Sequence, residues 1–317
     1  MANVPTTTAT MANLVQTAYD RLVEFALRSQ PLFRAVADKR PAQQAMPGSS
    51  VVLELYQDLA TQTAILNEIV DPDAVAIGNP TTVPITLNEY GAAVLMTKKL
   101  NLFALSDVDP AIANIVAYNL ADSVDEVVQT VLRGGTQVIR RNAGTLIYNG
   151  GTTAAVAAGD TFNSPAVRLA VAKLRAQKVV PRKGSMYWCG IHPEVSHDLR
   201  AEVGSAAWRD PHNYSAPGNI WAGEIGSYEG AYFIETPRAF SALDGPGGTG
   251  RVFRSYFAGQ QALAEACAEE FHVVIGPVVD KLMRQRPIGW YGVAGWSIYR
   301  QEALIRVETS SSIHTLA

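Results

Sequence analysis

One amphipathic segment of about two dozen residues limits most strongly how this chain can fold. Asp109 can cap the free backbone N–H groups of a helix, and Pro110 after it suits the first helical position. The apolar residues that follow recur at helical spacing, namely Ile112, Ile115, Val116, Leu120, Val124, Val127, Val128, Val131 and Leu132. Those that fall mainly on the opposite side are Asp122, Asp125, Glu126, Gln129 and Arg133.

This pattern predicts a helix from Pro110 to about Arg133, roughly 35 Å long at 1.5 Å per residue. Gly134 and Gly135 are expected to end or bend it. Such a helix is long for a globular protein, so a sheet or another helix must cover its apolar side.

The residues before this helix have a β pattern. Val51–Leu59 and Val83–Met96 are strand-like, and the stretch from Ala60 to Thr82 between them contains turn residues. We therefore expect a long two-stranded excursion with an irregular tip. An isolated hairpin is barely stable in water, so a neighbouring subunit is a natural candidate to hold it.

The remaining elements are mixed. Residues 1–10 are expected to form a mobile arm. The predicted helices cover Leu14–Arg28, Leu32–Asp38, a helix capped by Ser164 with Val167, Ala170, Val171 and Leu174 buried, and His192–Glu202. The predicted strands are Thr145–Tyr148 paired with Gly151–Ala157, a fully buried strand at 185–191, and Val252–Phe257, Phe271–Ile275 and Trp290–Glu308. No βα unit repeats, so the predicted fold class is α+β.

Composition excludes several classes of protein. The 317 residues include 26 basic and 29 acidic side chains, a net charge of −3, which disfavours a strongly basic nucleic-acid binder. With 48% hydrophobic residues the chain has enough for a core, and disorder over most of its length is excluded. Charged residues make up 17%, below the roughly 25% of ordinary domains, which suggests a surface partly covered by another molecule, for which other copies of the chain are one candidate.

The sequence also bears on location. No apolar run reaches the roughly 18 residues that cross a bilayer, so no membrane partner is expected. Met1–Thr10 lacks the basic region of a secretory signal, which favours a protein made and kept in a cytoplasm, or in something assembled there.

The candidate chemical groups are few. Cys189 and Cys267 form no CxxC pair, and two free thiols are the favoured interpretation. His192 and His197 lie five residues apart, so on a helix their rings point in different directions and do not suit a metal site. We interpret His192 as a helix-start residue and His197 as solvated.

Loops and charge pairs are likewise interpreted as structural. Gly245–Gly250 lacks the lysine and following helix of a phosphate-binding loop. Asp71 and Asp73 could bind a cation, but Pro72 between them favours a turn. Arg140-Arg141 and Arg284–Arg286 are interpreted as solvated or intersubunit faces rather than DNA-binding patches. The sequence therefore predicts no catalytic residue, no cofactor site and no metal site.

The order of these segments resembles the major capsid protein of tailed bacteriophages, which has the Hong Kong 97 fold. The local phrases that carry the resemblance occur in the right order over roughly residues 12–310. They are Val51–Leu59, Leu87–Gly91 leading into Leu95–Thr97, Ile191-His192-Pro193, Gly223–Gly226 and Ile234-Glu235-Thr236.

This resemblance implies an N-terminal arm at 1–49 and an extended E-loop hairpin at 50–100. It implies a peripheral domain around the long spine helix at 101–185 plus 271–317, and an axial domain at 186–270. The family has no catalytic residues to carry over.

The function implied is self-assembly into hexamers and pentamers that form the icosahedral head shell of a virion around double-stranded DNA, without sequence-specific binding. Portal, separate scaffolding and possibly decoration proteins are the other implied partners. Lys98 and Lys99 are expected near the base of the hairpin, but no Lys–Asn crosslink is predicted. Two alternatives stay open, an encapsulin-like bacterial nanocompartment shell and, less favoured, an α+β enzyme.

Overall fold

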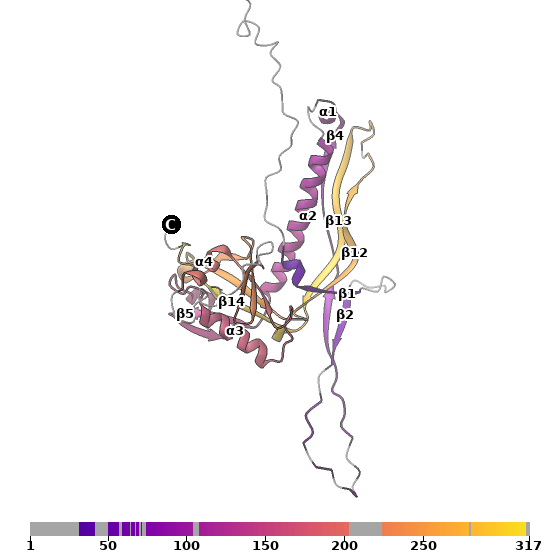
Figure 1. Cartoon of the computed structure of the whole chain (residues 1–317). Helices are drawn as coiled ribbons and strands as arrows, with labels where there is room; N and C mark the ends of the chain where they lie inside the picture. Colours follow the sequence, from indigo (N-terminus) through magenta and orange to yellow (C-terminus); the bar gives the residue numbers. More distant parts are fainter. Residues whose placement is uncertain are drawn as a thin grey trace, which may run out of the picture.

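The computed structural model describes residues 32–41, 50–56, 59–63, 65–66, 68–69, 71, 74–103, 108–202, 224–278 and 280–314. The predicted mobile arm and the predicted helix Leu14–Arg28 lie outside these residues. The described chain forms a long arm, a rounded body beside its lower part, and a hairpin that projects away from both (Figure 1).

The arm consists of one long helix on a four-stranded sheet. The strand order is β1 (Ala37–Pro41), β12 (Leu263–Ile275), β13 (Gln285–Ile298) and β4 (Asn88–Thr97), and helix α2 (Val108–Arg133) runs along it (Figure 1). Met96, Val116, Ile288 and Trp290 form a small core between helix and sheet. The Trp290 indole Nε1–H donates to Asn119 Oδ1 at 2.9 Å, which satisfies the polar end of this buried ring.

The helix confirms the main sequence prediction. It begins at Val108, close to the predicted start, and ends at Arg133, directly before Gly134. Val116, Val124, Val128 and Leu132 of the predicted apolar stripe are buried. The prediction is wrong for Ile115, which is 48% exposed because the sheet covers a narrower sector of the helix than the stripe occupies.

The prediction is also wrong for Asp125 and Gln129, which were expected on the polar side and are buried. Asp125 accepts the backbone N–H of Phe33 at 2.7 Å and the Arg238 Nε–H at 3.2 Å. The helix is thus covered by two further segments, the 3₁₀ turn η2 (Phe33–Val36) and the loop after β9. Burial of this carboxylate is tolerated because both partners hydrogen-bond to it.

Asp125→Asn is expected to lower the free energy of unfolding by about 1–3 kcal/mol, since it removes the charge that compensates the half-buried Arg238. Urea unfolding followed by circular dichroism measures this change. Asp122→Asn is the matched control: Asp122 also pairs with Arg238, but its side chain is 43% exposed whereas that of Asp125 is fully buried, so a smaller loss is expected. Equal losses in the two variants would contradict the assigned role of the buried carboxylate.

The body is built on an eight-stranded sheet. Its order is β6 (Thr145–Tyr148), β5 (Val138–Asn142), β14 (Leu304–Thr309), β11 (Arg251–Ala258), β7 (Tyr187–Ile191), β9 (Ala231–Glu235) and β8 (Glu224–Tyr228), with β10 (Ser241–Leu243) beside β11. Helices α3 (Ser164–Ala176) and α4 (Pro193–Ala201) bury their apolar sides in the same core as these strands.

Several local predictions for the body are confirmed. Every residue of β7 is buried, which confirms the prediction for 187–191 but not for the exposed Ser185 and the half-buried Met186, and Val167, Ala170, Val171 and Leu174 form the buried side of α3. The cap of α3 is one residue earlier than predicted, because the Asn163 side chain accepts the Ala166 N–H at 3.3 Å. Helix α4 begins after His192, as predicted.

Other predicted elements differ from the structure in their type, their partner or their bounds. The expected helix Leu32–Asp38 is η2 followed by β1. Thr145–Tyr148 pairs with β5, and the predicted partner Gly151–Ala157 contains the 3₁₀ turn η3 (Thr153–Ala155). Val83–Met96 divides at Leu87 into β3 (Thr81–Thr86) and β4, and Trp290–Glu308 divides at η5 (Gln301–Ala303) into β13 and β14. Alternating hydrophobicity continues across such breaks, so it does not reveal them.

The two sheets do not follow the domain boundaries that the family resemblance implies. β5, β6 and α3, which were assigned with the spine helix, belong with β7 to β11 in the body. β14 joins them from the C-terminal part of the chain, while β12 spans the boundary at 270 and lies in the arm. These memberships are set by strand pairing between distant segments.

The hairpin is attached to the arm at its root. β2 (Ser50–Leu55) pairs antiparallel with β3, and Leu55 lies opposite Thr81. Ile85 is fully buried against Ala264 and Ala266 of β12. Gly295 of β13 allows this close approach, since a side-chain carbon there would collide with the Thr86 carbonyl oxygen. The root therefore belongs to the folded subunit.

Candidate functional site

Beyond its root, the hairpin is apolar and exposed. Ile65 is 98% exposed and Ile69 is 92% exposed. The other large apolar side chains exposed on the same segment are Tyr56, Leu59, Leu66, Val75 and Ile77. Soluble monomers rarely expose contiguous apolar surface of this kind, and it marks a surface that another molecule covers.

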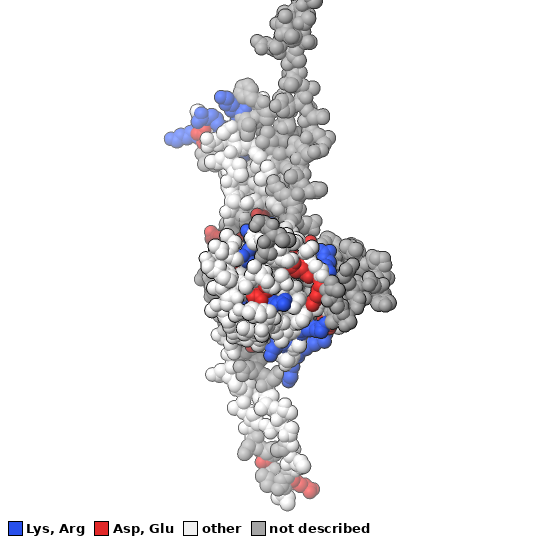
Figure 2. All heavy atoms as spheres, turned by 90° about the vertical axis from the view of Figure 1, so that its left-hand side faces the viewer, with Lys and Arg blue, Asp and Glu red and all other residues white. Residues whose placement is uncertain are grey.

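The end of this hairpin also carries negative charge. Glu68 and Asp71 are both exposed there, and Figure 2 shows acidic side chains at the lower end of the molecule. We call the described residues Ile65, Leu66, Glu68, Ile69 and Asp71 the acidic hairpin tip. Of the candidate cation pair, Asp71 is exposed in this segment, and Asp73 lies outside the described residues.

Basic side chains gather at the opposite end of the molecule. Figure 2 shows them at the upper end of the arm, where α1 (Lys98–Phe103) meets the β12–β13 connection. The two segments are in direct contact, because the Lys98 N–H donates to the Arg284 carbonyl oxygen at 2.7 Å. We call the exposed residues Lys98, Lys99, Lys281, Arg284 and Arg286 the basic arm tip.

This position corrects the expectation for the two lysines. Lys98 and Lys99 were expected near the base of the hairpin, but the ten-residue strand β4 carries the chain from that base to the far end of the arm. Arg284–Arg286 is exposed, which agrees with its interpretation as a solvated or intersubunit face.

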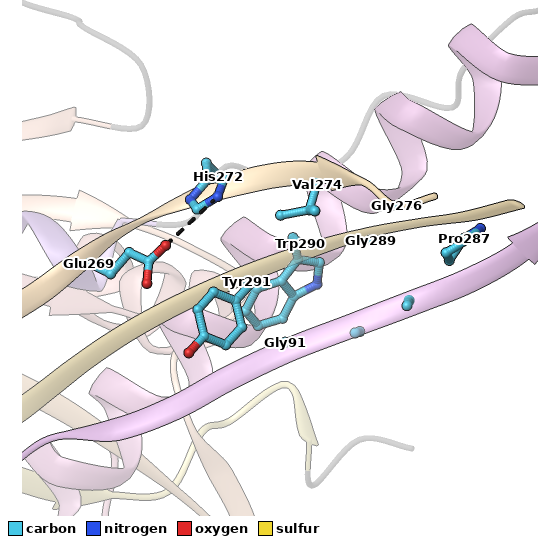
Figure 3. Close-up of a pocket in the computed structure, with 11 residues that line it drawn as sticks. Gly91, Glu269, His272, Val274, Gly276, Pro287, Gly289, Trp290 and Tyr291 are labelled. Atoms are coloured by element: carbon cyan, nitrogen blue, oxygen red, sulfur yellow. Dashed lines mark ion pairs between the residues drawn. The ribbon is translucent and has the colours of Figure 1, made fainter. Parts of the chain in front are cut away.

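A shallow groove of about 610 Å³ lies on the four-stranded sheet (Figure 3). It is lined largely by small residues, among them Gly91, Gly289 and Ala93, so backbone forms much of its floor. The His272 Nε2 lies 3.9 Å from Glu269 Oε1, an exposed pair at the edge. Among the lining residues that the structure describes there is no serine, cysteine or lysine that could act as a nucleophile.

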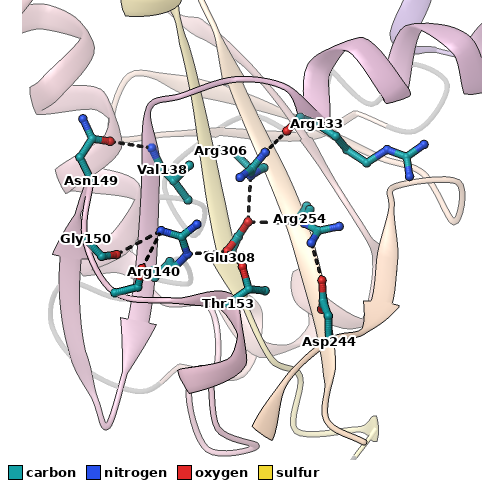
Figure 4. Close-up of polar contacts among 11 residues, drawn as sticks. Arg133, Val138, Arg140, Asn149, Gly150, Thr153, Asp244, Arg254, Arg306 and Glu308 are labelled. Carbon is teal, nitrogen blue, oxygen red and sulfur yellow. Dashed lines mark hydrogen bonds and ion pairs between the residues drawn. The ribbon is translucent and has the colours of Figure 1, made fainter. Parts of the chain in front are cut away.

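A buried ionic cluster lies inside the body (Figure 4). Glu308 of β14 is fully buried, and its carboxylate lies 2.7 Å from Arg140 Nε, 2.9 Å from Arg306 Nε and 3.4 Å from Arg254 Nε. The Thr153 hydroxyl donates to it at 2.8 Å. The cluster ties β5, β11 and β14 together across the sheet, which is a structural role.

The electrostatics of Glu308 follow from these partners. Burial by itself would raise the pKa of this carboxyl, but the Thr153 hydrogen bond and the positive charges of Arg306 and Arg140 outweigh it. The pKa of Glu308 is therefore lowered from its ordinary value of 4.5. For Arg306 burial is the larger influence, and it lowers the pKa of that guanidinium despite the nearby Glu308.

The prediction that Arg140-Arg141 is a solvated or intersubunit face is wrong. Arg140 is mostly buried against Glu308, and Arg141 donates to the Thr161 carbonyl oxygen at 2.6 Å. Both arginines serve contacts inside the subunit. Sequence spacing does not reveal this, because the partners lie 168 and 20 positions away.

The remaining candidate groups have local structural roles. His192 caps α4 by accepting the Glu194 N–H at 3.3 Å, and His197 is exposed, as predicted. Burial lowers the pKa of His192 and raises the pKa of the Cys189 thiol well above its ordinary value. Gly245–Gly250 forms a tight loop around the 3₁₀ turn η4 (Pro246–Gly248) between β10 and β11.

The described residues contain neither a cluster of metal ligands nor a membrane-spanning helix. In the described residues no three His, Cys, Asp or Glu side chains gather as a metal site would require. None of the described helices is both long and apolar enough to cross a bilayer.

Comparison with known proteins gives a consistent answer. The family model of phage capsid proteins matches residues 8–296 of the chain. The capsid of Ralstonia phage GP4 is similar in structure, with a TM-score of 0.78 and 14% identity, covering 97% of this chain and 98% of that one. No curated protein sequence matches.

Two further solved structures agree. The capsid of cyanophage Pam1 has a TM-score of 0.73 at 13% identity, covering 98% of this chain and 100% of that one. The acid-stable capsid of Helicobacter pylori bacteriophage KHP30 has a TM-score of 0.70 at 12% identity, covering 98% and 99%. These likenesses confirm the predicted α+β fold of the Hong Kong 97 type.

Proposed function

Because the chain belongs to the phage capsid protein family, we propose that its copies assemble into hexamers and pentamers that close an icosahedral shell around double-stranded DNA. The family makes it a structural protein, the major capsid protein of a tailed-phage head. The alternatives of an encapsulin-like shell and of an α+β enzyme are not favoured by this family.

The observation that carries the proposal is the exposed hairpin. Its seven large apolar side chains are 55–98% exposed in the described subunit, and association with another copy would remove them from water. The low charge content of the chain supports the same conclusion, because the faces of a shell subunit are covered by its neighbours.

The proposed regions follow the sheets of the subunit. We assign the four-stranded sheet with α2 to the peripheral domain and the eight-stranded sheet with α3 and α4 to the axial domain. We assign residues 50–86 to the E-loop hairpin and residues 1–49 to the N-terminal arm, whose strand β1 adds to the edge of the peripheral sheet. In the proposed shell, axial domains meet at the centres of hexamers and pentamers.

Further partners belong to the same proposal. A portal, a separate scaffolding protein and decoration proteins would complete a head that assembles in the host cytoplasm. DNA would be enclosed without sequence-specific contacts, and the subunit would have no enzymatic activity.

Electron microscopy of the purified protein in negative stain tests the proposal. The expected result is closed, uniform shells, or capsomers that close into shells when scaffolding protein is added. A small oligomer that stays unassembled under both conditions would contradict the proposed function. Analytical ultracentrifugation supplies an independent measure of the same assemblies.

The free subunit is expected to bind duplex DNA weakly at ~150 mM salt, near the weak end of non-specific affinities, about 10⁻⁴ M. The net charge of −3 opposes binding to phosphates, and several arginines are already paired with carboxylates within the chain. Fluorescence anisotropy with a labelled duplex at several salt concentrations measures both affinity and salt slope. Tight binding with a steep slope would contradict passive enclosure.

A further inference from the structure

One part of the body carries six cationic side chains and no acidic residue. Residues 161–193 contain no aspartate or glutamate, and they hold three of the seven lysines of a chain whose net charge is −3. The six belong to helix α3 or to the turn that joins it to β7, and they are Arg168, Lys173, Arg175, Lys178, Arg182 and Lys183. Like charges repel each other, so such a cluster costs stability unless anions neutralise it.

These side chains gather at one end of the eight-stranded sheet, where β7 and β9 begin and the antiparallel β6 ends. Lys173 Nζ lies 4.6 Å from the centre of the Tyr148 ring in β6, and Lys183 Nζ lies 5.5 Å from that of Tyr232 in β9. Figure 2 shows basic side chains on the lower side of the body, where Figure 1 places α3. β6 and β9 are five strand spacings apart, so the cations spread over a distance on the order of 20 Å.

Carboxylates of the subunit neutralise only part of this charge. The two pairs are Arg182 with Asp38 at 3.1 Å and Arg168 with Glu229 at 3.2 Å. Lys173, Arg175 and Lys178 form no ion pair with a carboxylate of the described residues. We give the name basic body patch to the residues Lys173, Arg175, Lys178 and Lys183, of which the last three are exposed.

The end of the helix accounts for only part of the patch. Lys173 and Arg175 lie in the last turn of α3, where cations stabilise the negative end of the helix dipole. Lys178 follows the helix with a backbone φ of 55°, a left-handed conformation that ordinarily favours glycine or asparagine. A lysine at this position strains the backbone and gains no carboxylate partner in the described subunit, which points to a role for its charge outside the subunit.

The chemistry of this surface fits phosphates better than a protein partner. Among residues 161–193, all of which the structure describes, Val180 is the one large apolar side chain that is exposed. A protein interface has an apolar centre, whereas non-specific contact with nucleic acid needs only cations that reach separate phosphates. Phosphates follow one another at about 3.4 Å along each DNA strand, so a patch of this width meets several of them. We propose that the basic body patch binds the phosphates of packaged double-stranded DNA.

The contact is weak in one subunit and is repeated in every copy of the shell. Four cations supply few phosphate contacts, which agrees with the weak binding expected of the free subunit. In a closed shell the same contact becomes multivalent. The end of the sheet where β7 and β9 begin then faces the interior of the shell. The inference rests on the proposed function and adds to it the surface that meets the DNA.

Removal of the charges tests the inference on the unassembled, full-length subunit. The variant neutralises three positions, by Lys173→Gln, Arg175→Gln and Lys178→Gln. It is expected to bind a labelled random-sequence duplex at least about tenfold more weakly at low salt. Its plot of log affinity against log salt should be flatter by about 2.7, since each lost phosphate contact removes about 0.9. The matched control removes the same charge from the basic arm tip, by Lys98→Gln, Lys99→Gln and Lys281→Gln, and should keep most of the slope.

Lys178→Asn separates the charge of this residue from its backbone conformation. Asparagine adopts the left-handed conformation at lower cost than lysine, so the melting temperature should not fall. The salt slope should still become flatter by about 0.9, because one phosphate contact is lost. An unchanged slope in this variant would contradict contact of Lys178 with phosphate.

Fluorescence anisotropy measures affinity and slope, and circular dichroism establishes that each variant is folded. Equal flattening in the triple variant and in its control would mean that only net charge matters, and would overturn the inference. Tighter binding of the unaltered subunit to a polyglutamate peptide than to the duplex would assign the patch to an acidic protein and also overturn it. Failure of the unaltered protein to form shells would contradict the proposed function alone, because the binding assay uses unassembled subunits.

Discussion

Replacing Thr61–Asn79 by an Asn-Gly turn is expected to abolish shell assembly while the subunit stays folded. The segment lies beyond the last paired residues of the hairpin, Leu55 and Thr81, so the ladder of β2 and β3 stays intact. Ile85 keeps its buried contacts with Ala264 and Ala266. The described residues of the deleted part are exposed, so its removal should change the melting temperature little.

Loss of assembly follows because the shortened hairpin no longer reaches a neighbouring copy. Size-exclusion chromatography should show monomers or single capsomers, and circular dichroism should match the unaltered chain. A full-length variant with Ile65→Ser and Ile69→Ser separates the chemistry of the tip from its length, and we expect it to assemble poorly. Closed shells from the shortened protein would contradict an intersubunit role, and unfolding would place the segment in an intramolecular core.

Glu308→Ala is expected to lower the free energy of unfolding by about 3–5 kcal/mol, the usual cost of removing one partner from a buried ionic cluster. It would leave Arg140, Arg254 and Arg306 facing one another in the body without their shared carboxylate. Urea unfolding at pH 7 measures the loss. Glu126→Ala is the matched control, because Glu126 is 58% exposed in its pair with Arg133, and its removal should cost at most about 1 kcal/mol.

The same cluster predicts a dependence on pH. The pKa of Glu308 is lower in the folded subunit than its ordinary value of 4.5, so the ionised carboxylate stabilises the fold above that pH. This stabilisation should be lost as the pH falls below about 4.5 and through the folded pKa. Unfolding curves between pH 7 and pH 3 should therefore fall more steeply for the unaltered chain than for Glu308→Gln. Parallel curves would contradict an ionised Glu308 in the fold.

Much of the local structure could be predicted because it depends on neighbours in sequence. The apolar repeat from Val116 to Leu132 defines one face of a helix whatever covers it, and glycines directly after it end that helix. The unbroken apolar run of β7 and the four buried positions of α3 follow from the same local periodicity. The exposed hairpin could also be anticipated, because Ala60–Thr82 has turn residues and little alternation.

What the sequence left open depends on partners far along the chain. From its place in the amphipathic pattern, Asp125 is expected on the surface of the helix. In the structure it is covered by Phe33, 92 positions earlier, and Arg238, 113 positions later. Arg140 is likewise expected to be solvated, but in the structure it is paired with Glu308. The division of Val83–Met96 between two sheets likewise depends on β2 and β13. Local periodicity determines which face of an element is apolar, whereas only tertiary packing determines which polar groups are buried and which strands share a sheet, because both require pairing between distant segments.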